Sequence, residues 1–316
     1  MTNGLQAGDR FFRKIYRQDA MCITSLQHLG SSVWSRFMRN KRLLSLLIPL
    51  LSFVLCLCLF ILIFFSGCTI KSRKEYGVFL GINKEQIDRL RDYRIVVIEP
   101  SEFQTDQIRA LHREGKKVYG YLNVGAIEVY RPYFNRFKGN TLGQYKDWPD
   151  ERWIDVSSPE WQRFIVNELG KKYAEMGFDG LFLDNTDVYH HYSTEDNFRG
   201  LCSIMKGLKG HNLSLIINGG DDFVLRCIDE NRALSLFDGI NQETVFTSID
   251  FKNKSYGRQT KKETLYFKKY ISRVKKFGLS VYLLEYGADG SLADDIESYC
   301  KENGFFWYNA KGLELN

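Results

Sequence analysis

Carboxylate side chains stand at the ends of several predicted β-strands in this 316-residue chain. Asp184 and Asp187 come directly after one strand, Glu243 after another, and Glu285 after a third. We find no Ser/His/Asp arrangement, and the pair His190-His191 that follows Asp187 is not expected to bind a metal. Two carboxylates that flank a glycosidic bond can hydrolyse it, one as the acid and the other as nucleophile or base. These residue types indicate carbohydrate chemistry.

Aromatic and amide side chains accompany the carboxylates, and aromatic faces stack on sugar rings. The same carboxylates could instead hold a divalent cation, but ligands at a fixed local spacing are missing. We therefore expect no metal and no cofactor. The residues that we expect to contact substrate are Tyr121, Glu128, Asn185, Asp187, Tyr189, Asn218 and Glu285.

Short β-rich runs alternate with stretches of helical periodicity from residue 76 onward. Eight such units in about 250 residues match a closed (β/α)8 barrel, whose chemistry sits at the carboxyl ends of its strands. An open doubly wound sheet is the alternative, although no GxGxxG follows the first strand. The predicted strands are 76–80, 94–98, 117–122, 180–184, 213–217, 237–241, 279–284 and 305–308. The predicted helices are 84–91, 104–114, 159–176, 195–208, 221–233, 261–277 and 291–302.

The net charge of +6 is concentrated at the N-terminus. Residues 1–42 hold eight of the 44 basic residues and two of the 38 acidic ones, which leaves 36 of each in the rest of the chain. A balanced domain has no bulk basicity for a phosphate backbone, so we expect no nucleic-acid partner.

Residues 43–65 form an uncharged apolar run of 23 residues, and a bilayer core requires about 20 at helical rise. We expect a transmembrane or signal-anchor helix within residues 43–68. All the excess basic residues precede it, so the positive-inside rule makes residues 1–42 a cytoplasmic tail. The domain 71–316 is then expected outside the cytoplasm, anchored to the membrane.

The apolar run ends in Ser66-Gly67-Cys68, which is similar to a bacterial lipobox. Cleavage and lipidation at Cys68 is the alternative to a retained anchor, and both place the domain extracytoplasmically. The other six cysteines have no metal-ligand spacing and are too scattered for a disulfide framework.

Four segments carry a resemblance to a known family. They are GKKVYGYLNVGAIE at residues 115–128, WPDERWID at 148–155, GFDGLFLDNTD at 177–187 and FDGINQE at 237–243. Together they resemble glycoside hydrolase family 114, the endo-α-1,4-polygalactosaminidases, over essentially all of residues 76–308. The resemblance implies a (β/α)8 fold and endo-cleavage of an α-1,4-linked, partly deacetylated galactosamine exopolysaccharide, a biofilm polymer.

The same resemblance assigns the catalytic pair. Asp184 matches the family's aspartate after the fourth strand, as nucleophile or charge stabiliser, and Glu243 its glutamate after the sixth, as general acid/base. Glu285 is a rival partner for Asp184, because many barrel glycosidases carry an acid after strand seven. Retention or inversion depends on the distance between the two carboxylates, which the sequence leaves open.

Two other functional classes fit parts of the sequence. A catalytically silent barrel could bind glycan, although the presence of both Asp184 and Glu243 argues against it. A structural component of an exopolysaccharide export apparatus would explain the anchor and leave the carboxylates unexplained.

Overall fold

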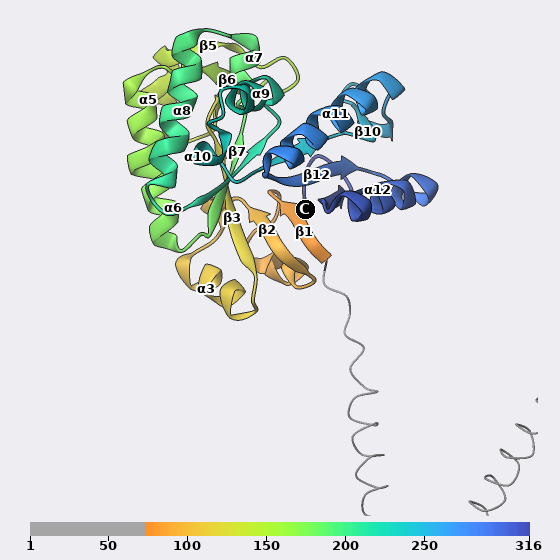
Figure 1. Cartoon of the computed structure of the whole chain (residues 1–316). Helices are drawn as coiled ribbons and strands as arrows, with labels where there is room; N and C mark the ends of the chain where they lie inside the picture. Colours follow the sequence, from red (N-terminus) through yellow and green to blue (C-terminus); the bar gives the residue numbers. More distant parts are fainter. Residues whose placement is uncertain (1–73) are drawn as a thin grey trace, which may run out of the picture. The chain divides into compact units, whose positions relative to one another are not determined.

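The protein is described by a computed structural model over residues 74–316, and Ser72–Asn316 forms one compact unit. Its centre is a sheet of eight parallel strands surrounded by helices (Figure 1). The strands are β1 (Lys74–Phe79), β2 (Tyr93–Ile98), β3 (Lys117–Asn123), β7 (Gly180–Asp184), β8 (Ser214–Asn218), β9 (Gly239–Glu243), β12 (Ser280–Tyr286) and β13 (Phe306–Ala310). They follow one another around the sheet in chain order.

The two outer strands of this sheet, β1 and β13, lie against each other and nearly close it into a barrel. The Phe79 ring on β1 packs on Tyr308 of β13 with 5.2 Å between ring centres. The prediction of a (β/α)8-type barrel is confirmed, and the open doubly wound sheet is excluded. Such a nearly closed parallel sheet brings all its carboxyl ends to one rim, which is where the predicted reactive side chains stand.

Helices connect the strands at nearly all the predicted places. They are η1 (Lys84–Leu90), α3 (Thr105–Arg113), α5 (Pro159–Arg163), η4 (Phe164–Gly170), α6 (Lys171–Met176), α8 (Glu195–Lys209), α9 (Asp221–Asp229), α10 (Ala233–Leu236), α11 (Lys261–Phe277) and α12 (Gly290–Asn303). Short pieces η2 (Pro100–Glu102), α4 (Phe134–Phe137), η3 (Lys138–Asn140) and α7 (Val188–His191) lie in the loops.

The predicted helix 159–176 begins where its capping residues indicate but is not uniform. The Ser158 side chain accepts a hydrogen bond from the Trp161 amide, and Pro159 occupies the first turn. Its middle seven residues are a π-helix, and the left-handed Gly177 ends it. The predicted helix 221–233 instead ends at Asp229, because Asn231 is left-handed and turns the chain into α10.

Two antiparallel sheets that the sequence did not predict stand in loops of the barrel. The loop after β3 forms a three-stranded sheet of β4 (Ala126–Glu128), β5 (Thr141–Gln144) and β6 (Glu151–Ile154). The loop after β9 forms the hairpin of β10 (Thr247–Asp250) and β11 (Ser255–Arg258). These strands are short and mostly polar, so they lack the apolar runs by which the barrel strands are identified.

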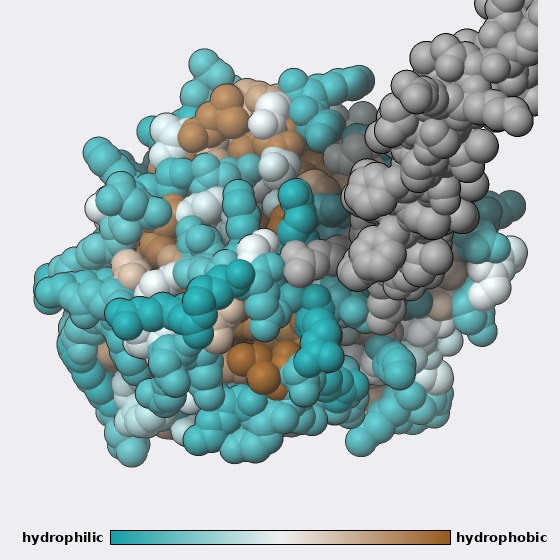
Figure 2. Space-filling view, turned by 90° about the horizontal axis from the view of Figure 1, so that it is seen from below, coloured by the Kyte–Doolittle hydropathy of each residue, from teal (hydrophilic) through white to brown (hydrophobic). Residues whose placement is uncertain are grey.

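The core lies inside the barrel and between the barrel and its helices. Val96, Val97 and Ile98 of β2 are fully buried in succession, as expected where helices cover the outside of a parallel sheet. The face shown in Figure 2 is mainly hydrophilic, with hydrophobic residues in small separate areas.

Among residues 74–316 no helix is both long and apolar enough to cross a membrane. The predicted tail 1–42, the predicted anchor 43–68 and Cys68 lie outside the described residues.

Candidate active site

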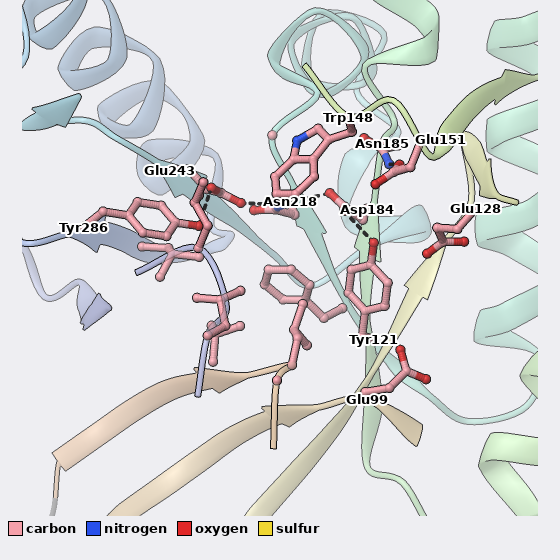
Figure 3. A pocket seen from close by; sticks show the side chains of 18 of the residues that line it. Glu99, Tyr121, Glu128, Trp148, Glu151, Asp184, Asn185, Asn218, Glu243 and Tyr286 are labelled. Carbon is pink, nitrogen blue, oxygen red and sulfur yellow. Dashed lines mark hydrogen bonds between the residues drawn. The ribbon is translucent and has the colours of Figure 1, made fainter. Parts of the chain in front are cut away.

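A pocket of about 930 Å³ opens at the carboxyl ends of the barrel strands (Figure 3). Strand ends and the loop sheets provide its walls. Seven of the nine residues predicted for the site line it, which are Tyr121, Glu128, Asp184, Asn185, Asp187, Asn218 and Glu243. Within residues 74–316 no group of three or more His, Cys, Asp or Glu side chains is arranged to hold a metal ion.

One amide joins the two predicted catalytic carboxylates. Asn218, the last residue of β8, donates from Nδ2 to Asp184 Oδ1 at 2.9 Å and to Glu243 Oε1 at 2.8 Å. The distance between Asp184 Oδ1 and Glu243 Oε1 therefore cannot exceed the sum of these two hydrogen-bond distances. The Asn241 side chain donates from Nδ2 to the side-chain oxygen Oδ1 of Asn218 at 2.7 Å, which fixes the orientation of the Asn218 amide.

A tyrosine hydroxyl completes the contacts of each carboxylate. Tyr121 donates to Asp184 Oδ2 at 2.8 Å, and Tyr286 donates to Glu243 Oε2 at 2.7 Å. Both tyrosines are buried, and their burial beside a carboxylate raises the pKa of each hydroxyl well above its usual value. They therefore remain proton donors to the carboxylates at neutral pH.

Burial changes the protonation of both carboxylates. Desolvation, opposed by the Asn218 hydrogen bond, raises the pKa of Glu243 to about 7, and the nearby Asp184 charge contributes to the rise. Desolvation also raises the pKa of Asp184, while hydrogen bonds from Asn218, Tyr121 and the backbone oppose this effect. A carboxyl with a pKa near 7 is suited to give and take a proton at neutral pH.

Asp187 supports the neighbouring loop from inside the pocket. Its two oxygens accept from the Gly220 amide at 3.2 Å, where the chain turns from β8 into α9. Gly220 has a positive φ of 62°, and a side chain there would collide with Thr186. Burial raises the pKa of Asp187 to about 6.

Glu151 of β6 lines the same pocket, although it is not among the residues predicted from the sequence. Its Oε2 accepts from Asn123 at 3.2 Å and from Asn185 at 3.1 Å. Burial raises the pKa of Glu151 to about 8, and the charges of Asp184 and Glu128 add to the rise. Its membership of the WPDERWID segment was the one sequence feature that could have indicated it.

Glu285 does not belong to the pocket, which corrects its prediction as a substrate contact and as the rival catalytic acid. Its side chain is fully buried, and its oxygens accept from the backbone amides of Phe246 and Thr247 and from the Thr247 hydroxyl. Burial raises the pKa of this carboxyl to about 7. Glu285 holds the loop that leads from β9 into β10.

Tyr189, also predicted to contact substrate, points away from the pocket. Its hydroxyl accepts from Arg226 on α9 at 2.9 Å, and its ring packs against Phe198 and Phe223. The residue stands on α7, whose short turn directs this side chain toward the outer helices. Tyr189 therefore packs helices together and does not line the pocket.

The two tryptophans of the WPDERWID segment differ in environment. Trp148 is 40% exposed, lines the pocket and meets Phe251 of the β10–β11 hairpin with 6.0 Å between ring centres. Trp153 is buried and stacks on Tyr145 at 4.3 Å. Of these two indoles, only that of Trp148 is available for a sugar ring.

Carboxyls with raised pKa values make the fold more stable in mild acid. Glu243, Glu285 and Glu151 have pKa values of about 7, 7 and 8, above the ordinary 4.5, so the folded state binds more protons than the unfolded state between these limits. The free energy of unfolding is therefore expected to fall as the pH rises from about 4.5 to about 8. Calorimetric melting temperatures across this range measure the effect.

The substitution Glu151→Gln should make that dependence less steep, most of all between about pH 7 and pH 8, because it removes the group that titrates highest while Glu243 and Glu285 still titrate at about 7. A melting temperature that falls with pH as steeply in the variant as in wild type would contradict the assignment.

Sequence comparison decides the family. The sequence profile of glycoside-hydrolase family GH114 matches residues 69–310, well over half of the chain. The chain belongs to family GH114. This GH114 member is thus a glycoside hydrolase by family, and the fold and the paired carboxylates agree with that membership.

Solved structures share the fold of this GH114 chain. The glycoside hydrolase domain of PelA from Pseudomonas aeruginosa superposes with a TM-score of 0.65 at 15% identity, over 76% of this chain and 95% of that domain. Aspergillus fumigatus Ega3, solved in complex with galactosamine, gives a TM-score of 0.59 at 17% identity, over 78% of this chain and 92% of the other.

Curated relatives also match in sequence, each over part of its length. An uncharacterised protein of Deinococcus radiodurans is 26% identical over 142 residues, which are 40% of this chain and 45% of that protein. One from Methanocaldococcus jannaschii is 23% identical over 243 residues, 70% of this chain and 68% of the other. The match thus spans less than half of the Deinococcus relative.

Proposed function

We propose that this GH114 protein hydrolyses a galactosamine-containing polysaccharide at internal α-1,4 linkages, with Asp184 and Glu243 as its catalytic pair. The observation that carries the proposal is the pair of half-buried carboxylates joined by one Asn218 amide at the rim of the barrel. The family resemblance and the galactosamine complex of Ega3 support the choice of polymer.

The two environments favour different roles for the carboxyls. Glu243 has a pKa near 7 and a single hydrogen bond to each oxygen, which suits the general acid/base. Asp184 accepts hydrogen bonds from Asn218, Tyr121 and the Asn185 amide that favour its charged form, which suits the nucleophile. Glu243 would protonate the glycosidic oxygen as its bond to the anomeric carbon breaks and Asp184 bonds to that carbon. Glu243 would then take a proton from water, which attacks the same carbon and releases Asp184.

The test is the release of new reducing ends from partly deacetylated α-1,4-galactosamine polymer by the purified full-length protein. The size distribution of early products distinguishes internal cleavage, which gives mixed oligomers, from cleavage at chain ends, which gives one short product. Binding of the polymer without release of reducing ends would refute the enzyme and favour a glycan-binding barrel.

The shared amide donor predicts retention of anomeric configuration. One oxygen of Asp184 and one of Glu243 both lie within 2.9 Å of Asn218 Nδ2. The distance between the two carboxyl groups is therefore closer to the roughly 5–5.5 Å of retaining enzymes than to the roughly 6.5–9.5 Å of inverting ones. Proton NMR of the first products should show the α anomer before mutarotation. Initial formation of the β anomer would exclude a covalent intermediate on Asp184.

We also propose that the catalytic domain lies outside the cytoplasm, held to the membrane by the apolar segment 43–65. Protease added to intact cells should then digest the domain. Mass spectrometry of the N-terminus distinguishes a retained anchor from cleavage and lipidation at Cys68. Full protection of the domain until the cells are lysed would contradict this location.

A further inference from the structure

Two cysteine side chains meet where helices α8 and α9 pack against each other outside the barrel. Cys202 on α8 is half-buried, Cys227 on α9 is fully buried, and both are free thiols. The two thiols form a hydrogen bond with each other. Because the residues belong to different helices, it is the packing of these helices that brings their sulfur atoms together.

The aromatic side chains one helical turn earlier show that these two helix faces are in contact. Phe198 precedes Cys202 by four residues, and Phe223 precedes Cys227 by four. Residues four apart lie on the same face of a helix, one above the other. The Phe198 and Phe223 rings pack with 5.6 Å between ring centres. The two helices therefore meet first at the rings and, one turn later, at the thiols.

An arginine lies beside the pair and makes the two thiols unequal. Arg232 donates from Nη1 to Cys202 Sγ at 4.0 Å, and its backbone amide donates to the Cys227 carbonyl oxygen at 2.9 Å. Its charge is shared with Glu230, which it meets at 3.2 Å. The hydrogen bond from Cys227 lowers the pKa of the Cys202 thiol and Arg232 adds to the effect, while burial opposes it. The same bond, together with burial, raises the pKa of Cys227.

We propose that Cys202 and Cys227 form a reversible disulfide that links α8 to α9. A thiolate is the nucleophile in disulfide exchange, and Cys202 is both the thiol that ionises more readily and the more accessible one. Cys227 lies in contact with it and is placed to complete the exchange. This inference is independent of the proposed hydrolase activity.

The oxidant that we propose is a small disulfide such as oxidised glutathione. The Cys202 thiolate attacks one sulfur of the oxidant, which forms a mixed disulfide and releases one glutathione thiolate. Cys227 then loses its proton and attacks the Cys202 sulfur, which displaces the second glutathione. Two protein thiols are oxidised, one oxidant molecule is reduced to two thiols, and the two protons of the protein thiols end on the two glutathione molecules.

Such a link would join two helices that continue from loops of the candidate site. Helix α9 begins at Asp221, directly after Gly220, whose amide donates to Asp187. Asp187 itself precedes α7, and α8 follows α7 in the chain. The disulfide would therefore close a second connection between segments that already meet at the contact of Asp187 with Gly220, and it should hinder their separation when the protein is heated.

The first measurement locates the bond by mass spectrometry. Purified full-length protein is equilibrated with oxidised glutathione, alkylated under denaturing conditions and digested with trypsin without reduction. Trypsin cleaves after basic residues and places the two thiols on separate peptides, 200–206 and 227–232. These two peptides should be found joined, two hydrogen masses below their sum, and dithiothreitol should separate them. Recovery of both peptides alkylated, glutathionylated or joined to other cysteines would overturn the proposal.

The second measurement compares the melting temperatures of the oxidised and the reduced protein. Oxidised wild type should melt about 5 to 10 °C higher, because the disulfide closes a loop of about 25 residues in the unfolded chain. Cys202→Ala should abolish this difference, whatever its own effect on stability. Cys300→Ala, which removes a buried free thiol from α12, is the matched control and should keep the difference. Oxidation that raises the melting temperature of Cys202→Ala as much as that of wild type would contradict the link.

Discussion

Replacing Asp184 with asparagine is expected to lower kcat for polysaccharide hydrolysis by about ten thousandfold, the order lost when a nucleophile is removed. The fold should survive, because asparagine can still accept from Asn218 and donate to the Tyr121 hydroxyl oxygen. The loss would come from the weak nucleophilicity of an amide oxygen. Initial rates of reducing-end release measure it.

The smaller variant Asp184→Ala distinguishes a nucleophile from a passive charge. It opens space beside the sugar carbon, and added azide should attack there and form a glycosyl azide of inverted configuration. Asp179→Asn is the matched control at the opposite end of β7, where that carboxylate accepts from the Val118 amide. Full activity in Asp184→Asn, or equal losses in Asp184→Asn and Asp179→Asn, would refute the assignment.

The substitution Glu243→Gln is expected to lower kcat on the polymer by about a hundred- to ten thousandfold, the contribution of a general acid/base. Glutamine can accept from Asn218 and donate to Tyr286, so the geometry is kept while the transferable proton is lost. In wild type, kcat/KM should fall as the pH rises through about 7, the pKa of Glu243, because the acid must be protonated. The variant should lose this limb of the pH profile.

Glu285→Gln provides the matched control, since Glu243 is the last residue of β9 and Glu285 is the next-to-last residue of the neighbouring strand β12. Glu285 lies outside the pocket and binds the loop at Phe246 and Thr247. Its substitution should lower the melting temperature and leave the turnover of folded protein nearly unchanged. If Glu285→Gln lost as much activity as Glu243→Gln with an unchanged melting temperature, the catalytic pair would have to be reassigned.

The sequence alone determined the barrel and the position of its reactive rim. Strand runs such as 95–98 and 181–183 are apolar without interruption, and the helices between them carry local start and stop residues. These features depend on near neighbours in the chain. Parallel strands with helical connections then place Asp184, Asn218 and Glu243 at one edge without further information.

Tertiary structure decided which side chains at that edge share the pocket. Glu285 and Glu243 look equivalent in sequence, but the loop after β9 folds over Glu285 and occupies both its oxygens. Tyr189 points away from the pocket and accepts a hydrogen bond from Arg226, which is 37 positions later in the chain. Burial and partners of this kind depend on contacts between distant residues, which local patterns do not encode.

Glu151 is the opposite case, a residue that lines the pocket but could not be predicted from local sequence. It reaches the pocket because β6 pairs with β4 across a loop of the barrel and sets Glu128 opposite Glu151. That register depends on the fold of the whole loop and not on the residues next to Glu151. Residues that are neighbours in the chain determined the barrel and its acidic rim. Contacts between segments that are distant in the chain decided which carboxylates meet, which are neutralised and which remain free for a substrate.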